Sequence, residues 1–159
     1  MILYFAYGSC MHEKDFQDSV SVFERWGKAI LKDRKIAFTH WSGRRDEPTG
    51  VADIVKLDGH DVEGILYAIE ESYLPRLRNR EGYPYVYSEE HVSLIYKGKM
   101  IDNVLTYSVV NKSKQEYIPS EEYARLILEG GKEELSETYL KELHDHITWL
   151  RNGHGIRKI

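Results

Sequence analysis

The amino-acid sequence predicts an α+β fold, a small and mostly antiparallel β-barrel flanked by helices. Strand-like runs dominate the first two thirds of the chain, and the better helix-like runs follow them. This order differs from the regular βαβ alternation that a parallel sheet requires. About seven strands in one compact domain favour closure into a barrel, because closure removes exposed edges.

The strands are expected as one lone run and three pairs. They cover residues 2–7, 26–31 with 36–41, 50–57 with 62–69, and 85–96 with 100–110. Asp58-Gly59 is a strong tight-turn signal between two apolar runs, so residues 50–69 are predicted to form a hairpin. Residues 32–35 and 97–99 are the expected turns of the other pairs. The polar, charged segment 42–49 is expected to be a mobile loop that could gate a barrel mouth.

Three helices are expected, and each has a recognisable start or end. The first spans residues 70–80. The second begins after the N-cap Ser120 and stops at Gly130-Gly131. The third runs from residue 136 to residue 152, because apolar residues recur there at helical spacing. The tail, residues 153–159, is expected to be a frayed end.

Length, charge and composition restrict the class of protein. We expect residues 1–159 to form a single domain, because a chain of this length can bury one core comfortably. A net charge of −4 argues against nucleic-acid binding, and no apolar run approaches the roughly 20 residues of a membrane span. The N-terminus lacks a signal-peptide pattern, and the single cysteine cannot form an internal disulfide, so a cytoplasmic location is expected. The sequence does not determine the oligomeric state, and a homodimer is one of the open alternatives.

The stretch YFAYGSCM, residues 4–11, is the first candidate binding site. A strand that ends on Gly8 and leads into a helix start exposes unpaired backbone N–H groups. Together with the helix dipole, these groups favour an anion such as a carboxylate. Most strand-Gly-Ser turns only redirect the chain, however, so the pattern alone favours a structural turn.

Glu81 is the second candidate, at the junction between a predicted helix and the next strand. Gly82 gives the backbone freedom there, and tyrosines follow closely. A partly buried carboxylate at such a junction would have a raised pKa, as a general base near neutral pH needs. The alternative is a surface glutamate paired with Arg78 or Arg80, and spacing alone favours that alternative.

Metal-binding and cysteine-dependent chemistry have weaker support. His144-Asp145-His146 resembles a ligand cluster, but residues two apart lie on different sides of a helix. Cys10 could be a nucleophile at a helix start, although the sequence names no histidine partner for it. Neither a metal nor a cofactor is therefore predicted, and the sequence contains no phosphate-binding glycine loop.

Several segments together carry a resemblance to a known family. They are Tyr4–Ser9, Glu81-Gly82, Val62–Tyr67, and the C-terminal run of Pro119–Tyr123, Gly130-Gly131, Leu135 and Tyr139. Over most of its length the chain resembles the γ-glutamylcyclotransferase-like family, which includes γ-glutamylamine cyclotransferases and AIG2-like proteins. The opening motif and the Glu-Gly pair are the more specific parts of this likeness.

The resemblance implies an enzyme with a pocket at one barrel mouth, acting on a small-molecule γ-glutamyl amide. The α-amine of the substrate would attack its own γ-carbonyl, close 5-oxoproline and expel the other amine, with no metal or cofactor. Glu81 would take a proton from the α-ammonium and give one to the leaving nitrogen. The substrate-binding residues that the family motif implies are Tyr7, Gly8, Ser9, Cys10, Met11, Tyr87 and Tyr123, with the turn amides gripping the γ-glutamyl group.

One position departs from the family pattern, because Cys10 stands where the family usually has asparagine. The leaving amine is open: glutathione, γ-glutamyl amino acids, an ε-lysine isopeptide and a γ-glutamyl-protected metabolite amine all fit. Two other hypotheses remain beside the cyclotransferase. One is a non-catalytic barrel that binds a small ligand, and the other is a transferase that depends on Cys10.

Overall fold

The computed structural model describes residues 1–158 of the chain. Within that range, five strands close into a barrel in the order β1-β3-β2-β4-β5. Their bounds are Ile2–Ala6 (β1), Glu24–Ser42 (β2), Thr49–Ile69 (β3), Tyr87–Tyr96 (β4) and Lys99–Val109 (β5). The pairings are antiparallel except between β1 and β5, which run parallel at Tyr4 and Leu105. The predicted fold class is confirmed.

Two long strands replace the two short hairpins predicted at residues 26–41 and 50–69. β2 pairs with β3 on both sides of a bend, residues 24–32 opposite 61–68 and residues 34–42 opposite 49–56. At the bend Asp33 has a φ of 60°, and its carboxylate accepts a hydrogen bond from the Gly59 N–H at 3.0 Å. The predicted Asp58-Gly59 hairpin is wrong, because these residues bulge out opposite Asp33 and do not reverse the chain.

The chain reverses instead at residues 43–48, between β2 and β3, where the sequence predicts a loop. The hairpin of β4 and β5 is confirmed, with Lys97 and Gly98 at positive φ in its turn. Merging two predicted pairs into two long strands therefore reduces the expected seven strands to five.

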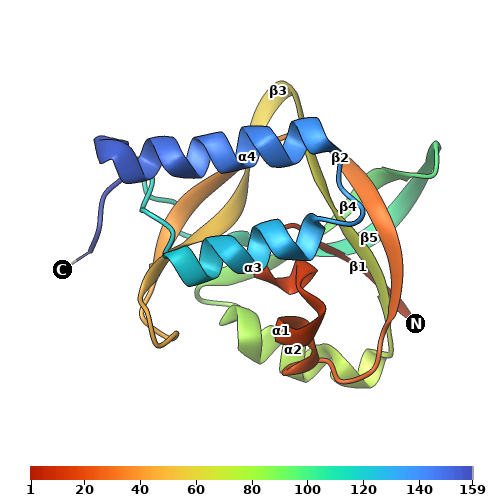
Figure 1. The fold of residues 1–159 in the computed structure, drawn as a ribbon. Helices are drawn as coiled ribbons and strands as arrows, with labels where there is room; N and C mark the ends of the chain where they lie inside the picture. Colours follow the sequence, from red (N-terminus) through yellow and green to blue (C-terminus); the bar gives the residue numbers. More distant parts are fainter. Residues whose placement is uncertain (159) are drawn as a thin grey trace.

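The helices gather on one side and at one end of the barrel. They are a 3₁₀ turn at Ser9–Met11, α1 at Glu13–Gln17, a 3₁₀ turn at Glu71–Tyr73 leading into α2 at Leu74–Glu81, α3 at Glu121–Gly131, and α4 at Glu137–Trp149, continued by a π-helical turn at Leu150–His154. Figure 1 shows α3 and α4 side by side across one face, with α1 and α2 below α3. The N-caps are Ser120 and Ser136, whose hydroxyls accept from the N–H groups of Tyr123 and Tyr139.

Gly130 brings α3 into direct contact with the Ser9–Met11 turn. A Cβ at this position would lie 2.5 Å from the His12 nitrogen and 2.6 Å from the Met11 carbonyl carbon. No side chain fits at that separation, so this glycine, which lies within α3, is needed for close packing. It couples the position of α3 to the turn that the sequence singles out.

The C-terminal tail differs from the frayed end expected at residues 153–159. The Ile118 N–H donates to the Ile156 carbonyl, and the Ile156 N–H donates to the Glu116 carbonyl, both at 2.9 Å. The prediction is therefore wrong as far as Ile156, because backbone hydrogen bonds fix that residue. Residue 159 lies outside the described part of the chain.

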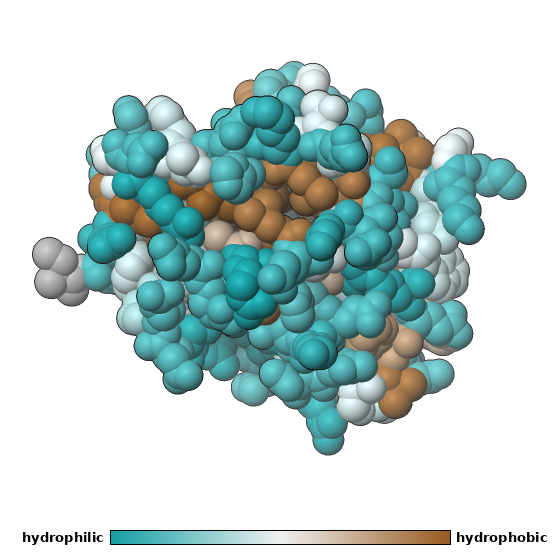
Figure 2. Space-filling view, viewed as in Figure 1, coloured by the Kyte–Doolittle hydropathy of each residue, from teal (hydrophilic) through white to brown (hydrophobic). Residues whose placement is uncertain are grey.

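The apolar side chains of strands and helices fill the barrel and the space beneath α3 and α4. Figure 2 shows a band of apolar surface between the more polar outer faces of these two helices. Phe5, Phe16, Leu66 and Tyr67 are fully buried in the core. Among residues 1–158, no helix combines the length and the apolar character needed to cross a membrane.

Candidate functional site

A small cavity, here called the inner cavity, opens where β1 ends. Its volume is about 40 Å³, and its lining residues are Tyr4, Tyr7, Gly8, Ser9, Cys10, Ala52, Glu81, Tyr87, Tyr107 and Tyr123. Seven of the eight residues that the sequence and the resemblance single out lie here, and Met11 does not. Side chains from β1, α2, β4 and α3 thus converge on one point, although they are far apart in the sequence.

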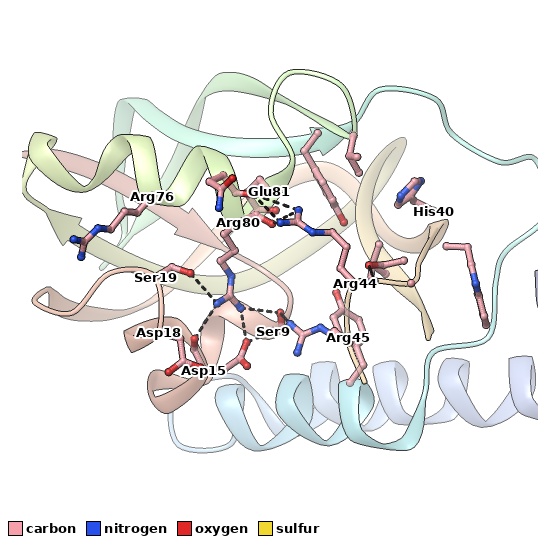
Figure 3. Close-up of a pocket in the computed structure, with 18 of the residues that line it drawn as sticks. Ser9, Asp15, Asp18, Ser19, His40, Arg44, Arg45, Arg76, Arg80 and Glu81 are labelled. Atoms are coloured by element: carbon pink, nitrogen blue, oxygen red, sulfur yellow. Dashed lines mark hydrogen bonds and ion pairs between the residues drawn. The ribbon is translucent and has the colours of Figure 1, made fainter. Parts of the chain in front are cut away.

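A larger space, here called the outer cleft, continues from the inner cavity toward solvent. It measures about 760 Å³ and shares Ser9, Glu81, Tyr87 and Tyr123 with the inner cavity. Figure 3 shows Glu81 close to arginines that come from α2 and from the loop between β2 and β3. Glu81 therefore stands at the junction of a narrow tyrosine-lined space and a wide charged one.

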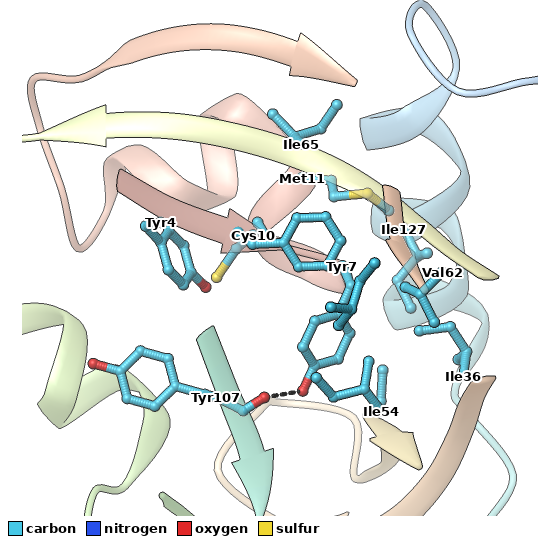
Figure 4. Close-up of a cluster of buried hydrophobic side chains, with 14 of the residues drawn as sticks. Tyr4, Tyr7, Cys10, Met11, Ile36, Ile54, Val62, Ile65, Tyr107 and Ile127 are labelled. Carbon is cyan, nitrogen blue, oxygen red and sulfur yellow. Dashed lines mark hydrogen bonds between the residues drawn. The ribbon is translucent and has the colours of Figure 1, made fainter. Parts of the chain in front are cut away.

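Met11 faces away from both spaces. Its N–H donates to the Gly8 carbonyl at 3.0 Å, which closes the 3₁₀ turn. Its side chain is fully buried and points toward Ile65 and Ile127 in the core (Figure 4). The preceding amides, those of Ser9 and Cys10, have no acceptor inside the turn, because they come before its first hydrogen bond. Met11 therefore does not offer the amide that the resemblance implies.

The buried Tyr67 and the partly buried Arg25 hold this turn from behind. The Tyr67 hydroxyl donates to the Cys10 carbonyl at 2.8 Å. Arg25 donates to the Met11 carbonyl and to the Tyr67 hydroxyl, both at 2.7 Å, and pairs with Glu134. Neither Arg25 nor Tyr67 was expected at the site, and the one available signal was an arginine directly before the strand expected at residues 26–31. Their bonds fix the orientation of the peptide groups that face the cavity.

Glu81 is the last residue of α2, and Gly82 ends the helix with a φ of 66°. The Glu81 Oε1 atom lies 3.5 Å from the Tyr4 hydroxyl and 3.8 Å from the Cys10 sulfur, both long contacts. Burial raises the pKa of Glu81 above its ordinary value of 4.5, and the nearby Arg80 charge only partly offsets this rise. Such a carboxyl group can exchange a proton closer to neutral pH than an exposed glutamate.

The arginines beside Glu81 in the sequence are engaged elsewhere. Arg78 forms a bidentate ion pair with Glu89, at 2.8 and 2.9 Å. Arg80 pairs with the Asp15 carboxylate and donates to the Asp15 carbonyl at 2.8 Å. The alternative of a surface glutamate paired with Arg78 or Arg80 is therefore wrong, since within residues 1–158 Glu81 forms no ion pair with either of them.

The tyrosines of the inner cavity are fixed through their hydroxyls. Tyr7 donates to the Tyr107 carbonyl and Tyr87 donates to the Ala52 carbonyl, both at 2.6 Å. Tyr123 differs, because its oxygen accepts a hydrogen bond from the Ala52 N–H at 3.0 Å. Its own O–H proton is thus free to point elsewhere, and burial raises its pKa so that it stays protonated. Tyr123 can therefore donate a hydrogen bond to a bound group.

Cys10 is buried and points toward Tyr4 (Figure 4). Burial raises the pKa of its thiol from 9.0 to about 11. At neutral pH almost all of it is the thiol, whereas the thiolate is the nucleophilic form. This environment disfavours the hypothesis of a transferase that depends on Cys10. Within residues 1–158, no group of three His, Cys, Asp or Glu side chains could hold a metal ion.

Comparison with known proteins gives consistent matches. The model of the AIG2-like family matches residues 61–143, just over half of the chain. The chain is 33% identical over 156 residues to YkqA of Bacillus subtilis (strain 168), which is provisionally named a gamma-glutamylcyclotransferase. The alignment covers 96% of this chain and 54% of YkqA, so the chain spans about half the length of that relative.

Several solved structures are also similar to this chain. The crystal structure of YkqA matches with a TM-score of 0.81 at 30% identity, over 98% of this chain and 56% of that one. A gamma-glutamyl cyclotransferase matches with a TM-score of 0.80 at 26% identity, over 90% and 86% of the two chains. A human protein matches with a TM-score of 0.80 at 27% identity over the same shares.

Proposed function

Because the chain belongs to the AIG2-like family, we propose that it is a γ-glutamylcyclotransferase, which releases 5-oxoproline and a free amine from a γ-glutamyl amide. One observation carries the proposal, the environment of Glu81. This residue has a carboxyl group of raised pKa, forms no ion pair with either neighbouring arginine, and lies at the junction of the inner cavity and the outer cleft. The names of the similar proteins add support.

The chemistry follows from the position of Glu81. Its carboxylate takes a proton from the α-ammonium group of the substrate, and the free α-amine attacks the γ-carbonyl carbon. The tetrahedral intermediate then collapses as the protonated Glu81 gives its proton to the leaving nitrogen and the bond to that nitrogen breaks. The ring nitrogen loses its second proton, which passes through the Glu81 carboxylate to the freed amine, so the products are 5-oxoproline and an ammonium ion. The nucleophile is part of the substrate, so the main task of the protein is to hold the glutamyl chain folded back on itself.

The surroundings of Glu81 suit the other groups of the substrate. The amides of Ser9 and Cys10 and the hydroxyl of Tyr123 are donors that can stabilise the α-carboxylate or the developing oxyanion. The inner cavity, about 40 Å³ in volume, has no room for the glutamyl group and a leaving amine together. A γ-glutamyl group bound with its γ-carbonyl at Glu81 would therefore direct the leaving amine into the outer cleft.

The test is a time course of the purified chain with γ-glutamyl amides, followed by mass spectrometry. The proposal expects 5-oxoproline and the free amine to appear in equal amounts. Binding without any product would instead support a non-catalytic barrel. Three expectations remain predictions from the sequence: the cytoplasmic location, the single domain, and the absence of nucleic-acid and membrane partners. The oligomeric state stays open.

A further inference from the structure

The outer cleft contains arginines that the proposed chemistry does not use. Four arginines line it: Arg44, Arg45, Arg76 and Arg80. Two of them share one acidic partner, because Arg45 and Arg80 both pair with Asp15. By contrast, no carboxylate of residues 1–158 forms an ion pair with Arg44 or Arg76. Of these two cations, Arg44 lies beside Glu81, whereas Arg76 lies farther along α2 (Figure 3).

Arg44 is held next to Glu81 by the end of α2. Its Nη1 atom lies 3.3 Å from the carbonyl oxygens of Asn79 and Arg80, and its Nη2 atom lies 3.2 Å from that of Asn79. A guanidinium group has five N–H donors, so these three contacts leave donors free. Figure 3 shows the side chain crossing the cleft from the β2–β3 loop to reach this position. The acidic residues that follow Arg44 in the loop do not line the cleft.

We propose that Arg44 binds a carboxylate on the leaving amine and thereby selects γ-glutamyl amino acids over γ-glutamyl derivatives of simple amines. This inference rests on the proposed function. With the scissile amide at Glu81, a carboxylate one carbon away from the leaving nitrogen would lie in the outer cleft on the side of Arg44. A planar guanidinium suits a carboxylate because it can donate two parallel hydrogen bonds.

The competing role for Arg44 is structural. Its contacts satisfy carbonyls at the C-terminal end of α2, where a positive charge is also favourable. A substitution could therefore disturb Glu81 and slow every substrate equally. The readout must be a ratio between two substrates, because a common loss of rate cancels in that ratio.

Two compounds that differ only in the carboxylate provide the test. They are γ-glutamyl-alanine and γ-glutamyl-ethylamide, compared by kcat/KM for 5-oxoproline release. For the wild-type chain we expect the alanine compound to be favoured by about tenfold or more, as a hydrogen bond between charged groups allows. Arg44→Gln should bring this ratio close to one.

Arg76→Gln is the matched control, because it removes the same charge from the same cleft. Arg76 lies five residues before Glu81 on α2, away from the reacting centre (Figure 3). Its substitution should leave the ratio of the two compounds near the wild-type value. A wild-type ratio near one, an unchanged ratio in Arg44→Gln, or an equal fall in Arg76→Gln would each overturn the inference.

Binding measured by calorimetry separates this inference from the proposed function. If neither compound yields 5-oxoproline, the proposed function fails, and the affinities then decide the inference alone. Tighter binding of the alanine compound that Arg44→Gln abolishes would support the carboxylate site, and equal binding would overturn it. If both compounds are converted equally well, the cyclotransferase proposal stands and the inference fails.

Discussion

The inner cavity and the outer cleft meet at Glu81 but are built differently. In the inner cavity, tyrosine hydroxyls bond to backbone atoms and the turn is held by buried side chains. In the outer cleft, arginines come from a loop and from α2, and two of them, Arg44 and Arg76, are exposed. A rigid interior suits the fixed ring closure, whereas an adaptable exterior suits a leaving group that differs between substrates.

The largest expected effect is on catalysis by Glu81. Glu81→Gln should lower kcat for 5-oxoproline release by about 10²- to 10⁴-fold, the usual range for loss of a general base. The thermal unfolding midpoint should stay the same or rise, because folding partly dehydrates a carboxylate that forms no ion pair with Arg78 or Arg80, and glutamine carries no charge. Glu90→Gln, which removes a carboxylate paired with Arg34 outside the cavity, is the control. Full activity in Glu81→Gln would remove the proposed role.

The next effect concerns the contact between α3 and the turn. Gly130→Ala should destabilise the protein by about 1–3 kcal/mol, because the new Cβ would overlap the backbone of Met11 and His12. Helix propensity alone would predict the opposite sign, a gain of about 1 kcal/mol. Urea unfolding measures whether the steric cost or the gain in helix propensity is larger. The rate of 5-oxoproline release should fall as the stability falls. A more stable and fully active variant would contradict the close packing described above.

A smaller effect is expected behind the turn. Tyr67→Phe removes the hydroxyl that holds the Cys10 carbonyl and should cost about 1–3 kcal/mol of stability, because the carbonyl is buried. The kcat/KM should fall as well, because the amides of the turn are no longer oriented. Tyr96→Phe loses a similar bond, to the Trp26 carbonyl at 2.8 Å, far from the cavity. Equal effects of both variants on kcat/KM would show that the turn needs no such support.

The smallest effect is expected at Cys10. Since the thiol is buried and its pKa is raised to about 11, iodoacetamide at pH 7.5 should modify it far more slowly than free cysteine. Mass spectrometry before and after unfolding in guanidinium chloride measures this protection. Rapid modification of the folded protein would revive a nucleophilic role for this residue.

The sequence was sufficient for the local features of the fold. Ser120 caps a helix as predicted, the last helix begins next to residue 136 as expected, and the β4–β5 hairpin turns at Lys97 and Gly98. It was insufficient for strand pairing. The Asp58-Gly59 pattern indicates an interruption of regular strand geometry, but it does not indicate which strand lies opposite. A bulge in a long strand and a hairpin turn share the same local chemistry.

The same limit applies to the site. Seven of the ten residues that line the inner cavity were predicted, mainly from a family motif. The ion pairs were not predictable, since Arg80 reaches Asp15 across 65 residues of sequence. Arg25 and Arg44 also contact backbone carbonyls that lie far away in the sequence. No residue pattern predicts such tertiary contacts.

The proposed role of Glu81 as a general base depends on the raised pKa of its carboxyl group, which forms no ion pair with Arg78 or Arg80. The most direct measurement is a ¹³C NMR titration of labelled glutamate carboxyl carbons, with the Glu81 signal assigned from its loss in Glu81→Gln. We expect a midpoint above the ordinary value of 4.5. Activity should fall through the same pH as the medium is acidified, because the base becomes protonated. A midpoint at or below 4.5 would remove the basis for Glu81 as the general base.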